Sequence, residues 1–340
     1  MRSYVHDYNI LQFISITFAI TYAMGGVIAF CYYTGRDISS LCILQMLYPG
    51  IAAVIIEKKN NSYNWLDKFC TGYLIGALLF IIVGVTGSIY QYSENFFLEV
   101  IIIVHFLLFI MLGVEYIKKS RELQKRLCCE KNCIFVLGCM YWVAFYMLFW
   151  FVANAISLGC AGDISCFIEN IMNKQNWYVC ISRFPSFLYN YLFFFGEEYG
   201  WRSFLQPKMQ KRFGQWKGII FLGFLWGIWH LPLCLFYYSS PEKCLYTVCS
   251  QILWCIVLAI VFAYIYTTEN KLITLIVIHF MHNLLATAFN FEANNAQDEG
   301  FFSMILSFII QMVLCCSTIA LVNHKRGAKN EKNNHNFREP

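Results

Sequence analysis

The chain has 340 residues, of which 59% are hydrophobic and only 13% are charged, and its mean hydropathy is +0.54. A soluble core of this length cannot hide so much apolar surface, which excludes an ordinary soluble globular protein. The net charge of +5 is small, and the chain has no basic stripe or RNA-binding motif, so nucleic acid is not an expected partner. The composition predicts an all-α, polytopic membrane protein that is embedded in a lipid bilayer.

Ten segments are long and apolar enough to cross a hydrocarbon layer about 30 Å thick. We expect them over residues 9–33, 39–56, 69–88, 96–117, 133–159, 185–206, 217–238, 245–266, 271–291 and 301–322. The chain then divides into five amino-terminal helices of unassigned role (1–184), a core with the buried ionisable residues (185–291), a last span (292–322) and a polar tail (323–340).

The positive charges predict the orientation of these spans. Most of the 25 Lys and Arg residues fall on the side of the amino terminus, and the opposite side holds only Arg36, Lys174, Arg183 and Lys243. Because cytoplasmic loops carry the excess of Lys and Arg, both termini are expected in the cytoplasm.

The 16 cysteines do not form a recognisable metal site. Most lie inside apolar runs, where cysteine behaves as a small hydrophobic residue. The cysteines at 128–133 have no fourth soft ligand at the spacing of a zinc finger, which favours ordinary thiols. Cys160, Cys166 and Cys180 share a predicted outer loop and can form a disulfide there, but the sequence does not give the pairing.

Ionisable residues inside the predicted spans gather in the sixth, seventh and ninth helices. They are Glu197, Glu198, Arg202, His230, His279 and His282, with Asn283 beside them. A charge in a bilayer costs several kcal/mol, on the order of 3 kcal/mol at a helix centre, so each is a functional hypothesis.

In the sixth helix, Glu198 and Arg202 are four residues apart and can form a salt pair on one face. Glu197 lies about 100° around the helix and is not engaged by that pair. A lone carboxylate in a dry site binds protons more tightly than in water, which suits a general base. The alternative is a helix end at the membrane surface, where all three side chains are solvated.

In the seventh helix, Gly223 and Gly227 form a small-residue face that lets another helix approach closely. Trp226 lies one turn before His230 on the same side. A lone histidine in a membrane helix is often a hydrogen-bonded packing residue, and this reading also applies to His105.

In the ninth helix, His279 and Asn283 share a face, and both can donate hydrogen bonds to an oxyanion. The alternative is interhelical hydrogen bonding worth about 1 kcal/mol. At a rise of about 1.5 Å per residue, Glu197, His230 and His279 lie roughly 12–20 Å from the inner ends of their helices. Because helices of alternating direction place these three residues at similar depths in the membrane, the sequence predicts one buried site.

The pattern Glu-Glu-x-x-x-Arg, aromatic-x-x-x-His and His-x-x-x-Asn on successive membrane helices resembles the CPBP family. This family comprises type II CAAX prenyl proteases and the bacteriocin-processing or immunity-associated membrane proteases also called the Abi family. The resemblance covers about 185–290, with Trp226 where the family usually has Phe.

The resemblance implies an intramembrane endopeptidase in which Glu197 and His230 activate water, and His279 and Asn283 hold the oxyanion. Glu198 and Arg202 would form the supporting pair. The family is commonly labelled a metalloprotease, and Glu197, His230 and His279 could hold zinc or another divalent metal. The same residues could equally work without metal, as glutamate-dependent catalysis. His282 lies outside the motif.

Other protease chemistries lack their residues in this chain. No His-Glu-x-x-His and no Gly-x-Ser-x-Gly motif occurs, and every Asp lies outside the predicted spans. Substrates would be membrane-associated peptides or proteins: leader-bearing ones in a bacterial plasma membrane, or prenylated ones in the endoplasmic reticulum of a eukaryote. Two other classes stay open, a non-catalytic scaffold or bacteriocin-immunity protein and a proton-coupled transporter.

Overall fold

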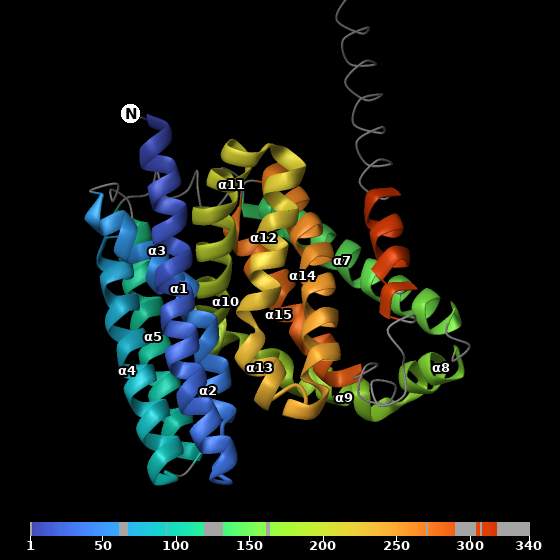
Figure 1. Cartoon of the computed structure of the whole chain (residues 1–340), viewed down its shortest axis with the longest axis horizontal. Helices are drawn as coiled ribbons and strands as arrows, with labels where there is room; N and C mark the ends of the chain where they lie inside the picture. The colour runs from blue at the N-terminus through green and yellow to red at the C-terminus, as the bar shows by residue number, and fades with distance from the viewer. Residues whose placement is uncertain are drawn as a thin grey trace, which may run out of the picture.

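A computed structural model describes residues 2–60, 67–92, 94–118, 132–160, 164–269, 271–289, 304–306 and 308–317. Every regular element in these ranges is a helix (Figure 1). The first half contains α1 (Arg2–Tyr33), α2 (Ser39–Leu44), η1 (Gln45–Leu47), α3 (Tyr48–Lys59), α4 (Asp67–Tyr90), α5 (Glu94–Lys118) and α7 (Asn132–Cys160). The second half contains α8 (Ile164–Met172), α9 (Lys174–Arg183), η2 (Phe184–Tyr189), α10 (Tyr191–Glu198), η3 (Tyr199–Leu205), α11 (Gln206–Phe213), α12 (Gln215–Trp229), α13 (Leu231–Phe236), η4 (Pro241–Lys243), α14 (Cys244–Glu269) and α15 (Leu272–Phe289).

Seven helices in the described ranges are long and apolar enough to cross a membrane. They cover Tyr8–Tyr33, Ser39–Lys59, Lys68–Tyr90, Phe96–Val114, Leu137–Ile156, Pro241–Thr268 and Leu272–Phe289. The all-α membrane bundle is confirmed, whereas the expected count of ten spans is not. The sixth predicted span is divided among η2, α10, η3 and α11 and carries several charges, and the seventh is divided between α12 and α13. The tenth meets only a shorter helix, Met304–Ser317.

The amino-terminal helices pack directly on the helix that carries the two glutamates. Gly50 of α3 and Gly196 of α10 lie so close that a Cβ on Gly50 would be 2.7 Å from the Gly196 Cα. One turn further, a Cβ on Gly200 would be 2.5 Å from the Pro49 carbonyl carbon. Because only glycine permits this approach, α3 and the α10–η3 segment are held backbone to backbone.

A second close crossing joins α12 to α14. A Cβ on Gly223 would lie 2.7 Å from the Ile256 Cα, and one on Gly227 would lie 2.5 Å from the Ile252 Cα. The predicted small-residue face of the seventh helix is thus a helix contact, and α14 is its partner. This crossing fixes the end of α12 that bears Trp226 and His230.

The amino terminus and α11 lie at one end of the bundle, and α2, α9 and α13 lie at the other (Figure 1). The predicted outer loop after the fifth span contains two short helices, α8 and α9, and Trp177 of α9 packs its ring 5.0 Å from that of Phe289 of α15. Cys180 is a free thiol in this segment, while the side chain of Cys160 lies outside the described residues. The cysteines at 128 and 129, the basic segment at 119–131 and the tail from 318 lie outside the described residues as well.

Candidate active site

The two glutamates stand at the point where the α-helix α10 becomes a π-helix, η3. Glu197 and Glu198 are the last residues of α10, and Arg202 lies within η3. π-Helical segments inside α-helices are frequent at functional sites. Neighbouring residues diverge by about 100°, so the two carboxylates meet different partners.

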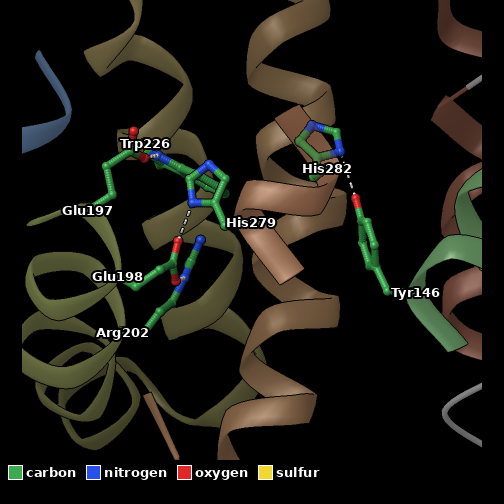
Figure 2. A network of polar contacts seen from close by, with 7 residues as sticks. All are labelled: Tyr146, Glu197, Glu198, Arg202, Trp226, His279 and His282. Carbon is green, nitrogen blue, oxygen red and sulfur yellow. Dashed lines mark hydrogen bonds and ion pairs between the residues drawn. The ribbon is translucent and has the colours of Figure 1, made fainter. Parts of the chain in front are cut away.

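Glu198 is a fully buried carboxylate with both oxygens engaged. Its Oε2 accepts a hydrogen bond from the Arg202 Nε at 3.2 Å, and its Oε1 lies 2.7 Å from the His279 Nδ1 (Figure 2). The side chains of Glu198 and Arg202 are 0% exposed. The predicted pair is therefore present, and it extends to His279 on α15, 81 residues away in the sequence.

Glu197 has a different environment. Its Oε2 accepts a hydrogen bond of 3.0 Å from the indole nitrogen of Trp226. Among the described residues its Oε1 has no hydrogen-bond donor, and the residue keeps 3% of its surface exposed. One carboxylate is thus neutralised by a cation, and its neighbour offers a free oxygen in an apolar site.

His230 and His279 both present the Nε2 atom of the ring. The His230 Nδ1 lies 2.8 Å from the Trp226 carbonyl oxygen, and since a carbonyl only accepts, Nδ1 carries the proton. The His279 Nδ1 donates to Glu198 in the same way. In the neutral rings each Nε2 is then a lone pair, available as a base or as a ligand. His230 ends α12, and Pro232 follows in the first turn of α13.

The guanidinium of Arg202 lies over aromatic rings. Its Cζ is 4.3 Å from the centre of the Trp226 ring and 5.3 Å from that of Phe262. In the described part of the chain, its Nη1 and Nη2 have no hydrogen-bond partner. Cation–π attraction therefore replaces the hydrogen bonds that a buried guanidinium otherwise needs.

The structure brings Glu197, Glu198, Arg202 and His279 together, and His230 adjoins them through Trp226, whose ring centre is 6.1 Å from its own. Asn283 is half-buried on α15, and no side-chain hydrogen bond joins its amide to the described residues. We therefore assign it no contact within this cluster.

The ligand atoms of Glu197, Glu198 and His279 lie within 4.8 Å of one another. A catalytic zinc site needs three protein ligands with an open position. Both oxygens of Glu198 already bind Arg202 and His279, and the group of three does not include His230. Within the described residues, Glu197, Glu198 and His279 are thus a candidate group for a metal ion in which the Glu198 oxygens also bind Arg202 and His279. The chemistry below is derived for the side chains alone.

His282 belongs to a separate contact on the other side of α15. Its Nδ1 lies 2.8 Å from the Tyr146 hydroxyl of α7 (Figure 2). Its Nε2 accepts a bond of 3.3 Å from the Trp254 indole of α14. Both ring nitrogens are thus engaged in joining three helices. His105 similarly bonds the carbonyl of Ile101 in its own helix and packs between aromatic rings.

Two contacts of the site were not anticipated from the sequence. One is the bond from Trp226 to Glu197, for which the indole nitrogen was the only signal. The other is Gln45, whose amide donates a bond of 2.9 Å to the carbonyl of Trp229, where α12 ends beside His230. The feature of the sequence that could have indicated this contact is a polar residue, Gln45, within an otherwise apolar span.

Residues 181–285 match the family model described as type II CAAX prenyl endopeptidase, Rce1-like. The matched segment runs from the end of α9 to α15 and contains every residue of the cluster. The resemblance drawn from the sequence motifs is thereby confirmed for this third of the chain. No curated protein and no solved structure matches the chain.

Proposed function

We propose that this chain, whose residues 181–285 are a domain of the CAAX-type intramembrane protease family, is an endopeptidase that hydrolyses peptide bonds of membrane-associated peptides with water activated by Glu197. The observation that carries the proposal is the contrast between the two adjacent glutamates. Glu198 is compensated by Arg202 and His279, whereas Glu197 keeps one oxygen without a donor among the described residues. A carboxylate held in that state in an apolar site is suited to removing a proton from water.

In the proposed reaction, a water molecule beside the free oxygen of Glu197 gives its proton to that carboxylate while its oxygen attacks the peptide carbonyl carbon. The tetrahedral intermediate then loses the amine, and the proton held on Glu197 passes to the leaving nitrogen. One water is consumed, the C–N bond is broken, and a carboxylic acid and an amine are formed. The Nε2 lone pair of His230 is a second acceptor for orienting the water.

His279 is proposed to stabilise the negative charge of the intermediate. Its Nδ1 donates to Glu198, which fixes the orientation of the ring and places a carboxylate beside it that can balance the charge of an imidazolium. A protonated Nε2 donates to the developing oxyanion, the interaction that contributes most in acyl-transfer sites. Asn283 is proposed to join it, four residues along the same helix. Arg202 and Glu198 act as the support of this ring.

The proposal is tested by incubating purified protein in liposomes with farnesylated peptides ending in Cys-aliphatic-aliphatic-X, and with leader-bearing membrane peptides, in water enriched in ¹⁸O. We expect cleavage of one class, with one ¹⁸O atom in the new carboxyl group of the product. Failure to cleave any member of the panel contradicts the proposal. Cleavage of the farnesylated class alone identifies the substrates as prenylated chain ends.

A further inference from the structure

Trp226 lies at the centre of the candidate active site and is 2% exposed. Its indole nitrogen donates to Glu197, and its ring face lies 4.3 Å from the Arg202 guanidinium carbon. Its ring centre is also 5.8 Å from that of His279. One side chain therefore contacts the proposed base, the cation of the supporting pair and the proposed oxyanion donor (Figure 2).

The first contact determines which oxygen of Glu197 is free. A buried carboxylate on a helix can rotate about its side-chain bonds, and a single donor at 3.0 Å fixes one of its oxygens. In the described part of the chain, the Trp226 indole is the donor that reaches Glu197. The bond therefore fixes Oε2 and leaves Oε1 as the oxygen that has no donor in the described part of the chain.

The second contact concerns the cation. The Arg202 terminal nitrogens have no hydrogen-bond partner among the described residues, and Glu197 is only five positions earlier, at the end of α10, which η3 continues. A guanidinium that reached Glu197 would form a bidentate pair and remove its basicity. The indole ring occupies the face of the guanidinium and keeps it beside Glu198 instead.

We propose that Trp226 is a positioning residue that keeps Glu197 competent as a base, by donating to one oxygen of that carboxylate and by holding the Arg202 guanidinium away from it. This inference rests on the proposed function and adds to it the means by which two adjacent glutamates take different roles. The two contributions separate by substitution: Trp226→Phe removes the N–H and keeps an aromatic face for Arg202, whereas Trp226→Ala removes both.

The kinetic test compares these variants on whichever peptide the wild-type protein cleaves. A hydrogen bond to a charged group that is lost should lower kcat for Trp226→Phe by about 10-fold to 100-fold, with KM little changed. Because the carboxylate without its donor takes up a proton more readily, the acidic limb of the pH–rate profile should move to higher pH. Trp226→Ala should lose more activity than Trp226→Phe.

Trp201→Phe is the matched control. Trp201 is fully buried on η3 beside Arg202, and its indole nitrogen has no hydrogen-bond partner in the described part of the chain. The same substitution there removes an N–H that makes no bond, so kcat and the pH profile should stay near those of the wild type. Equal losses in the two Phe variants would overturn the inference and indicate loss of packing alone.

A second measurement does not depend on catalysis. In protein labelled with ¹⁵N at the tryptophan indoles, the Trp226 resonance is the one lost in Trp226→Phe, and it should shift in Glu197→Gln while the Trp201 resonance does not. An unchanged Trp226 resonance in Glu197→Gln overturns the inference, whatever the cleavage rates of the Trp226 variants. If Glu197→Gln retains full activity, the proposed function itself fails; if Glu197→Gln is inactive while Trp226→Phe matches the wild type, only this inference fails.

Discussion

Alanine at Gly200 tests whether the amino-terminal helices hold the glutamate-bearing segment in place. The new Cβ would lie 2.5 Å from the Pro49 carbonyl carbon and 2.6 Å from its oxygen, distances that require backbone to move. Gly26, in α1, is the matched control, because a Cβ there meets nothing within 4 Å. Both substitutions add the same methyl group to a helix, so their difference isolates the contact with α3.

Forcing a methyl group into a close-packed contact costs about 1–3 kcal/mol, while alanine in place of a helical glycine otherwise gains about 0.5–1 kcal/mol. We therefore expect Gly26→Ala to be neutral or slightly stabilising. Gly200→Ala should lower Tm in detergent by several degrees, on the scale of about 2–4 °C per kcal/mol for large domains. Because Gly200 lies three residues after Glu197, its peptidase activity should fall as well.

Thermal unfolding of the two variants in the same detergent gives the comparison. If Gly200→Ala is as stable and as active as Gly26→Ala, then the backbone contact with α3 does not constrain the α10–η3 segment.

Four further outcomes follow from the contacts of the site. Glu198→Gln leaves the buried charge of Arg202 uncompensated and should cost about 3–5 kcal/mol in thermal unfolding, whereas Glu197→Gln should change Tm little; equal effects would contradict the different roles assigned to the two carboxylates. Tyr146→Phe leaves a ring nitrogen of buried His282 without its partner and should cost about 1–3 kcal/mol with kcat retained; a stable but inactive variant would place His282 in the chemistry. Gln45→Leu removes the donor to the carbonyl at the end of α12 and should lower kcat with little change in Tm. Unchanged kinetics would show that the position of His230 does not depend on this hydrogen bond. Catalysis by Glu197 alone needs no metal, so prolonged treatment with a metal chelator should leave the cleavage rate unchanged. A loss of activity that zinc restores would show that a metal takes part in the reaction.

Local spacing was sufficient to predict part of this site. Glu198 and Arg202 are four residues apart on one helix, and their pairing follows from the helical repeat. The close face of Gly223 and Gly227 likewise follows from their spacing. The membrane character follows from composition, because a chain so apolar has no soluble alternative.

The contacts between distant segments could not be predicted in the same way. The partner of His279 is Glu198, 81 positions earlier, and residue spacing does not favour Glu198 over Glu197 as that partner. The change from α-helix to π-helix after Glu198 has no signature in residue type. Hydropathy predicts ten spans, yet the sixth is divided in the structure among short α-, 3₁₀- and π-helical elements, and the seventh is divided at His230, two residues before Pro232.

The central claim is that Glu197 removes the proton from the attacking water. It is tested most directly by the cleavage rate of Glu197→Gln in proteoliposomes, read by mass spectrometry on the peptide that the wild-type protein cuts, with the folded fraction of both proteins matched by thermal unfolding. Glutamine keeps the shape of the side chain and its acceptor for the Trp226 indole, but it cannot take up the proton. Cleavage should therefore be lost while Tm is retained. A folded Glu197→Gln protein that cuts at the wild-type rate would contradict the claim.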